Sequence, residues 1–298
     1  MDQPCQTPIL LQHFAALKDP RQLVKVLYPL PEILLLVLCA TIAAADDFVE
    51  IKHWGETHMD FLRRFLPYKD GIPSHDALND LMNALDHALF SECFITWVNG
   101  LREGDLDVVS VDGKTSRRTH AKSNGRQALH MVSAWASRQR LVLGQQATDA
   151  KSNEITAIPL LLQRLELKGA LVTIDAMGCQ TKIAATILDR GADYLLAVKD
   201  NQPGLHDDIK RYFDDAPAGE VETLQTTDGD HGRIEVRRHV VSHKVDWLAK
   251  DSRLPGIKSI AMVENTVERN GETSCERRYY ISSVVLLAVL FANAVRWH

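Results

Sequence analysis

Two aspartates in this sequence each follow a short run of apolar and β-branched residues. Asp112 follows the run 107–111 (DVVSV), and Asp175 follows the run 170–174 (ALVTI). Open α/β sheets hold their ligand sites at the carboxyl ends of such strands. The 63 positions that separate the aspartates (175 − 112) have room for a hairpin and one crossover helix. We therefore expect the two carboxylates to lie side by side on adjacent central strands.

Two neighbouring carboxylates repel each other unless a cation lies between them. Mg²⁺ or Mn²⁺ suits such a pair, because both are hard ions that prefer oxygen ligands. Two such ions about 3.5–4 Å apart can activate an attacking oxygen and stabilise the leaving 3′ oxygen of a phosphodiester. Asp112 and Asp175 are thus candidate catalytic and metal-binding residues. Either aspartate taken alone has a simpler explanation, as a helix cap or a turn former.

A stretch rich in cations follows the first aspartate. Residues 113–140 contain no Asp or Glu. A local positive patch attracts phosphate even when the whole chain is acidic, as here with a formal net charge of −5. A solvated basic loop is the alternative interpretation. The cations of this stretch are Lys114, Arg117, Arg118, Lys122, Arg126, Arg138 and Arg140.

The elements around the aspartates follow one order: three strands, helix, strand, helix, strand, helix. An antiparallel start continued by parallel βα units is the ribonuclease-H-like topology, a mixed sheet flanked by helices. Further downstream we expect three more strands, and an apolar segment at 284–297 that fits either a helix or a strand. The expected strands are 107–111, 128–137, 140–148, 170–174, 193–198, 233–241, 259–266 and 276–282, and the helices are 154–167, 180–190 and 203–213.

The first hundred residues have a different, helical pattern. The apolar run Ile33–Ala45 is too short to cross a bilayer and fits a buried helix. Ser74 is a good N-cap for the next helix, and Leu78, Leu81, Met82 and Leu85 fall on one face at helical spacing. We expect an all-helical domain over residues 8–100, followed by a catalytic domain over 104–298.

The composition is that of an ordinary globular protein, with 45% hydrophobic and 24% charged residues in a chain of 298. Five scattered cysteines without a CxxC pair argue against a zinc site or a disulfide framework, and suit a reducing cytoplasm. The first residues have no basic segment followed by an apolar one, so a signal peptide is not expected.

Seven segments, in this order, resemble the H-repeat-associated transposases: GIPSHDAL, VVSVDGKT, ATDAKSNEITAIPLLL, LVTIDAMGCQ, YLLAVKDNQP, HGRIEVRR and YYISS. These are insertion-sequence enzymes of the DDE class, also found beside Rhs elements in bacteria. The resemblance implies metal-dependent cleavage and transfer of DNA strands, with Asp112 as the first acid and Asp175 as the second. It also favours contacts to the DNA backbone for Lys199 and Asn201, which the sequence alone would assign to a turn. Lys114, Arg117 and Arg118 are candidate DNA contacts because they follow Asp112 closely, although Lys114 could equally be solvated.

The family's third acid lies in a helix close to R-x-H-W-x-[IV]-E-N, downstream of YYISS. This sequence ends at His298 before that Glu, so we expect impaired activity. Glu235 lies in an R-I-E context that a related group uses for its acid, but an ion-paired structural role is the simpler interpretation. Glu154 opens a helix, where its charge meets the helix dipole favourably; a role near the site stays open.

Three hypotheses follow: a DDE transposase, a metal-dependent nuclease on the same fold, and an inactive remnant that still binds DNA. The expected cofactor is Mg²⁺ or Mn²⁺, as two ions. The expected partners are the element ends and target DNA, without a membrane, in the bacterial cytoplasm at the nucleoid. Assembly into a homo-oligomer on paired ends stays open. His231, His239 and His243 have no matching Cys or Asp, so we interpret them as scattered histidines rather than a metal site.

Overall fold

The structure, a computed structural model, describes residues 9–101, 108–115, 129–148, 154–230, 233–249, 253–269 and 272–297. The chain divides into two compact units, Met1–Leu101 and Arg102–His298. Each unit has a hydrophobic core cluster of its own.

The first unit is helical, without a strand among its described residues. Residues 48–62 form two helices, because the backbone leaves helical geometry at His58 (φ −115°, ψ 27°). The elements are α1 (Ile9–His13), η1 (Leu23–Lys25), α2 (Leu30–Ile42), α3 (Phe48–Thr57), α4 (Met59–Leu62), α5 (His75–Ala84) and α6 (His87–Leu101).

The apolar run of the first unit forms α2, a core helix. Pro31 lies in its first turn, where a missing N–H costs no hydrogen bond, and most of the helix from Ile33 to Ala40 is buried. The side chain of Ser74 caps α5 by accepting a hydrogen bond from the Ala77 amide at 3.2 Å. Within the described part of the chain, none of the helices has both the length and the apolar character needed to cross a membrane.

A buried pair joins α2 to the loop before α5. The Tyr68 amide donates to the Glu32 carboxylate at 2.8 Å, and the Tyr68 hydroxyl donates to the Glu32 carbonyl at 2.7 Å. Both residues are buried, at 1% and 6% exposure, and burial raises the pKa of the Tyr68 hydroxyl far above its usual value. Tyr68 thus joins two segments of the first unit through two buried hydrogen bonds.

The second unit is built on one sheet of nine strands in the order β3-β2-β1-β4-β5-β9-β8-β7-β6. β1, β4 and β5 are parallel, and every other neighbouring pair is antiparallel. The strands are β1 (Val108–Thr115), β2 (His130–Ala136), β3 (Leu141–Thr148), β4 (Leu171–Ile174), β5 (Asp193–Val198), β6 (Glu222–Asp230), β7 (Arg233–Ser242), β8 (Ser259–Arg269) and β9 (Glu272–Ser282).

The first five strands have the ribonuclease-H-like order and directions, which confirms the predicted fold class. β9 then adds to the outer edge of β5, and β8, β7 and β6 extend the sheet as an antiparallel meander. Three of these four strands were expected. β6 was missed because its sequence, ETLQTTDGD, is polar and lies at the edge of the sheet, so it carries little hydrophobic alternation.

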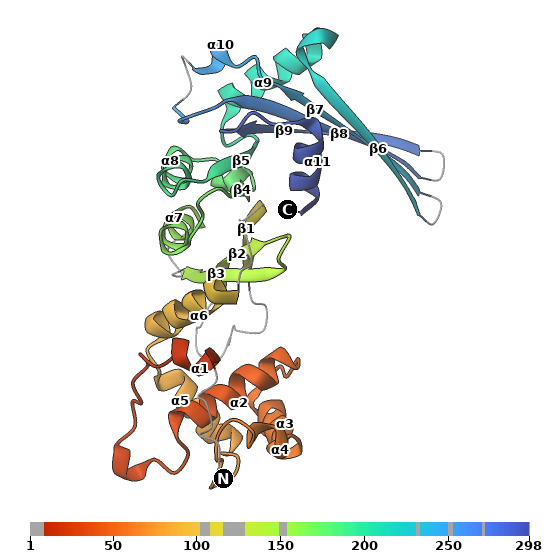
Figure 1. Cartoon of the computed structure of the whole chain (residues 1–298). Coiled ribbons are helices and arrows are strands. Elements are labelled where there is room, and N and C mark those ends of the chain that lie inside the picture. Colours follow the sequence, from red (N-terminus) through yellow and green to blue (C-terminus); the bar gives the residue numbers. More distant parts are fainter. Residues whose placement is uncertain are drawn as a thin grey trace, which may run out of the picture. The chain divides into compact units, whose positions relative to one another are not determined.

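Helices cover both faces of this sheet (Figure 1). α7 (Glu154–Arg164) and α8 (Thr181–Asp189) lie on one face, and α11 (Ala288–Trp297) lies on the other. On β9 two consecutive tyrosines pack against helices on opposite faces of the sheet. Tyr279 packs against Phe213 of α9 (Pro203–Asp215), whereas Tyr280 packs against Phe291 of α11. The remaining short elements are η3 (Ala176–Gly178), η4 (Ala218–Glu220) and α10 (Asp246–Ala249).

Several strand boundaries differ from the predicted ones: β8 ends at Arg269 rather than 266, and β9 begins at Glu272 rather than 276. The turn between β2 and β3 spans four residues, 137–140, and Arg140 takes a positive φ of 55°. β1 runs on to Thr115 instead of ending before Asp112, because β2 pairs with it over that whole length. Asp112 therefore lies within β1, at the point where pairing to β4 has ended.

We predict that Tyr68→Phe lowers the free energy of unfolding of the first unit by about 1–2 kcal/mol, because the buried Glu32 carbonyl loses its hydrogen bond. Urea denaturation of the full chain, followed by circular dichroism, measures the change. Tyr28→Phe is the matched control, since the Tyr28 hydroxyl makes no hydrogen bond to the described residues. Equal stability of the two variants would contradict the role assigned to Tyr68.

Candidate active site

The parallel register between β1 and β4 brings Asp112 and Asp175 to one edge of the sheet. Val111 is paired with Ile174, and each aspartate is the next residue along its strand direction. Neighbouring strands lie about 4.8 Å apart. Both aspartates are exposed, whereas the strand residues before them are buried.

The two side chains leave the sheet on the same face. Val108 and Leu171, four residues before the aspartates, belong to the core cluster that contains Phe291 of α11. Side chains alternate along a strand, so positions two and four residues further on return to that face. The backbone at Asp175 stays extended (φ −65°, ψ 177°), which carries the alternation one residue past β4.

A polar layer lies directly beneath the aspartates on this face. The Thr173 hydroxyl donates to the Ser110 hydroxyl at 3.2 Å, and both residues are buried. The Ser110 hydroxyl also donates to the Trp297 carbonyl at 3.0 Å, and Ser137 donates to the same carbonyl at 3.3 Å. The carboxyl end of α11 is therefore held two residues away from Asp112 along β1.

Asp175 has a local structural role as well as an exposed carboxylate. Its Oδ1 accepts hydrogen bonds from the amides of Met177 and Gly178, at 3.0 and 3.3 Å, and so caps η3. Gly178 is required by packing, because a Cβ at that position would overlap the Ile174 side chain. The cap fixes the Asp175 side chain through Oδ1.

The loop after β5 fastens this turn from the neighbouring strand. The Asn201 amide donates to the Ala176 carbonyl at 2.5 Å, and the Gln202 amide donates to the Cys179 carbonyl at 3.0 Å. Asn201, predicted as a DNA contact, thus has its amide group on the main chain directly after Asp175. Lys199, two residues earlier, is exposed at the same edge.

Lys114 is exposed on β1 and shares the face of Asp112, since the two are two residues apart. Arg138 and Arg140 lie in the turn between β2 and β3, at the far end of those strands from Thr115 and His130. The other predicted basic residues, Arg117, Arg118, Lys122 and Arg126, fall outside the described residues.

A network that sequence reasoning did not predict lies on the opposite face of β1. The Glu154 carboxylate is 2.7 Å from Nε2 of His130, and Nδ1 of His130 is 2.8 Å from the Thr115 hydroxyl. Glu154 begins α7, so the site-proximal role left open for it has a structural basis. The signal in the sequence was weak, because these residues are far apart until β1, β2 and α7 assemble.

Glu235 lies far from the aspartates. β7 is four strands away from β4, which corresponds to about 19 Å at ordinary strand spacing. Its carboxylate is 2.8 Å from the Arg237 guanidinium and only 13% exposed. This geometry supports the ion-paired structural interpretation over a role as third acid.

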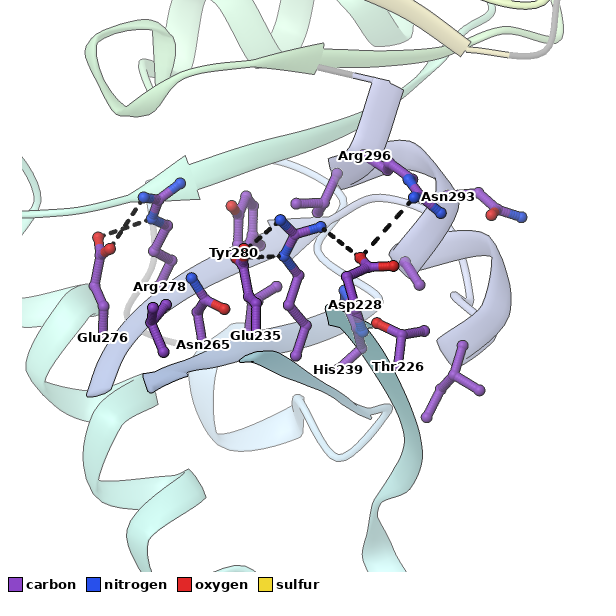
Figure 2. A pocket seen from close by; sticks show the side chains of 16 residues that line it. Thr226, Asp228, Glu235, His239, Asn265, Glu276, Arg278, Tyr280, Asn293 and Arg296 are labelled. Atoms are coloured by element: carbon purple, nitrogen blue, oxygen red, sulfur yellow. Dashed lines mark hydrogen bonds and ion pairs between the residues drawn. The ribbon is translucent and has the colours of Figure 1, made fainter. Parts of the chain in front are cut away.

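Glu235 lines the cavity shown in Figure 2, of about 590 Å³, between α11 and the face of β6–β9. The acids of this cavity are matched by arginines. Arg278 holds the pKa of the Glu276 carboxyl below its usual value through a 2.8 Å hydrogen bond, and Asp228 lies 3.7 Å from Arg237 and 4.0 Å from Arg296.

Two of the three histidines named from the sequence, His239 and His243, are among the described residues. His239 is buried in the cavity against Phe291, and burial lowers its pKa. His243 bonds the Leu286 carbonyl at 2.7 Å, and His231 is outside the described residues. Over the described ranges, no group of three or more His, Cys, Asp or Glu side chains has the arrangement of a metal site.

Known protein families match almost the whole chain. The family described as Transposase DDE domain matches residues 103–296, and the family described as DDE_Tnp_1-associated matches residues 11–98.

Similar proteins occur in Xanthobacter autotrophicus and Escherichia coli. A protein from the region 3′ of dhlA in Xanthobacter autotrophicus is 42% identical over 91% of this chain and 92% of its own length. The H repeat-associated transposases YhhI and YbfD of Escherichia coli (strain K12) are each 40% identical. YhhI aligns over 97% of this chain and 79% of its own length, and YbfD over 80% and 96%.

Among solved structures, a piggyBac transposase synaptic complex with hairpin DNA matches with a TM-score of 0.38 and 10% identity. The match covers 92% of this chain and 59% of that one. A likeness this weak supports no inference about the present chain.

We predict that Asn201→Asp loosens the turn that carries Asp175, because the donor to the Ala176 carbonyl is lost while the side-chain volume is kept. Loss of one such bond costs about 1 kcal/mol, so exchange of the Met177 and Gly178 amides should become about fivefold faster. Hydrogen exchange measures this. Asn83→Asp, at an exposed position of α5, is the control. Unchanged exchange in Asn201→Asp would refute the fastening role.

Proposed function

This chain belongs to the transposase DDE domain family, and we propose that it cuts and joins the DNA strands of an insertion sequence with the help of a divalent metal. The observation that carries this proposal is the pairing of Val111 with Ile174, which aligns Asp112 and Asp175 on one face of the sheet edge. Residues 104–298 would form the catalytic domain, and residues 8–100 its transposase-associated helical domain.

The two carboxylates fit a hard cation. Both aspartates are exposed, and neither makes an ion pair with another described residue. Both capping hydrogen bonds of Asp175 are accepted by Oδ1. We propose that its second oxygen binds the cation together with the Asp112 carboxylate. Mg²⁺ or Mn²⁺ held there would activate the attacking oxygen and neutralise charge on the leaving 3′ oxygen.

The remaining residues of the edge would hold the DNA backbone. Lys114 and Lys199 are exposed cations on β1 and after β5, and Arg117 and Arg118 follow β1 in the sequence. Asn201 acts on the turn of Asp175 through the Ala176 carbonyl, and we propose that its contact to DNA is secondary to that role. A local cluster of cations offsets the overall negative charge where phosphate approaches.

The third acid of the family pattern lies downstream of the residues that form β9. The end of α11 lies close to Asp112, because Ser110 and Ser137 both donate hydrogen bonds to the Trp297 carbonyl. Residues near the end of this helix can therefore approach the aspartates. We propose that a third carboxylate on this side of the sheet would join Asp112 and Asp175 in holding the metal.

We predict that Asp112→Asn and Asp175→Asn each reduce strand cleavage by more than about 100-fold, beyond the usual loss for residues that only support metal ligands. The assay uses purified full chain, Mn²⁺ or Mg²⁺, and labelled duplexes that cover the DNA flanking the gene. Asp189→Asn, an exposed acid on α8, is the matched control and should keep full activity.

The products separate the three hypotheses. Cleavage with strand joining supports a transposase, and cleavage without joining supports a nuclease on the same fold. A gel shift without cleavage identifies a DNA-binding protein that has lost its chemistry. Cleavage that survives both Asp→Asn changes would remove the aspartate pair from the mechanism.

A further inference from the structure

β1 has two neighbouring strands over its first half and only one over its second half. Up to Val111 the strand has β4 on one side and β2 on the other. From Asp112 to Thr115 it pairs with β2, while the pairing with β4 has already ended. Asp112 therefore lies on a strand end that one of its two neighbours no longer holds.

Side chains from α7 and β2 hold this strand end on the face opposite to Asp112. Glu154 and His130 are linked at 2.7 Å, and His130 is linked to Thr115 of β1 at 2.8 Å. We call these three residues the Glu154 network. The Glu154 and His130 side chains are 16% and 27% exposed, so water screens the links only in part.

The network packs directly against the backbone next to Asp112. A Cβ built at Gly113 would overlap the Glu154 carboxylate and lie 2.8 Å from Nε2 of His130. Residue 113 must be glycine for the Glu154 carboxylate to reach this position. The first turn of α7 thus rests on the peptide that follows Asp112.

The alternation of the strand shows which face the network occupies. Gly113 is opposite Val132, which in turn is opposite Gln146, and Gln146 accepts a hydrogen bond from Arg164 of α7 at 3.4 Å. Asp112 is opposite Ser133, in the row that faces the other way. Glu154 supports β1 from behind and does not share the face of the aspartate pair.

We propose that the Glu154 network is a positioning device for Asp112. The network holds β1 where β4 no longer pairs with it. It thereby fixes the position and orientation of the Asp112 carboxylate relative to Asp175. This inference rests on the proposed function, because it assigns the network to the metal-binding aspartate. The favourable position of Glu154 at the start of α7 explains the residue type, whereas the contact with Gly113 explains why the carboxylate turns toward β1.

The test measures Mn²⁺ binding to the full chain by titration calorimetry, together with hydrogen exchange of the peptide 108–115. We expect Glu154→Ala to weaken Mn²⁺ binding about 10–100-fold, the usual loss for residues that orient metal ligands, and to speed exchange. Glu154→Gln keeps an oxygen that accepts from His130, so it should bind Mn²⁺ within about threefold of the parent chain.

Gly113→Ala should reproduce the weakening, because the added Cβ displaces the Glu154 carboxylate. Gly204→Ala on α9 is its matched control, since a Cβ there meets nothing within 4 Å. Thr115→Val, a change at an exposed strand position that keeps the β-branched shape, is a milder second variant should Glu154→Ala fail to fold. It should weaken binding in the same direction.

Asp112→Asn separates the two ways of failing. If Asp112→Asn loses Mn²⁺ binding while folded Glu154→Ala and Thr115→Val keep it, the positioning role is wrong and the proposed function stands. If Asp112→Asn binds Mn²⁺ as the parent chain does, the proposed function is wrong and the positioning role falls with it. Equal weakening in Glu154→Gln and Glu154→Ala would also overturn the network, because hydrogen bonding to His130 would then not matter.

Discussion

The parallel pairing of β1 with β4 is the constraint on which the rest of the second unit depends. A slip of one residue would move Asp112 to the opposite face of the sheet, away from Asp175. Two features oppose such a slip. Val108 and Leu171 are buried together in the core beneath α11, and the hydroxyls of Ser110 and Thr173 meet on the same face. The strands are thus aligned by apolar contacts at their buried ends and by a hydrogen bond just beneath the aspartates.

α11 packs on this same face of the sheet. Its packing accounts for the apolar residues buried in and just before the helix. Residues 284–297 are almost entirely apolar, and they divide into two sets. Leu286, Ala288, Phe291 and Ala294 are buried against the sheet, whereas Val285, Leu287 and Val289 are more than half exposed. The buried set fills the space above β1, β4 and the meander, so the helix ends beside Ser110.

The sequence predicted those parts of the fold that local patterns determine. Apolar strands followed by Asp112 and Asp175, the Ser74 cap and the helical spacing of Leu78 and Leu81 are all signals carried by consecutive residues. β6 gave no such signal, because an edge strand needs few apolar side chains. The end of β1 was predicted too early for a related reason: Asp112 to Thr115 are polar or small, and only their pairing with β2 makes them a strand.

The immediate surroundings of the two aspartates were beyond prediction from one sequence for a different reason. The Asn201 contact to the Ala176 carbonyl joins residues 25 positions apart, and His130 meets Glu154 across 24 positions that include a whole hairpin strand. Propensity and spacing identify what each residue favours locally, but these contacts exist only after several elements have packed. The residue types were visible beforehand; their partners were not.

Charge compensation distinguishes the aspartate pair from the acids of the cavity beneath α11. Glu235, Glu276 and Asp228 all lie within 4 Å of an arginine, so the cavity beneath α11 balances its own charges. Asp112 and Asp175 have no such partner among the described residues, although their strands lie about 4.8 Å apart. Neighbouring carboxylates repel each other unless a cation lies between them. The two aspartates lie where the pairing of β1 with β4 ends, and this is the physical reason to place the chemistry there.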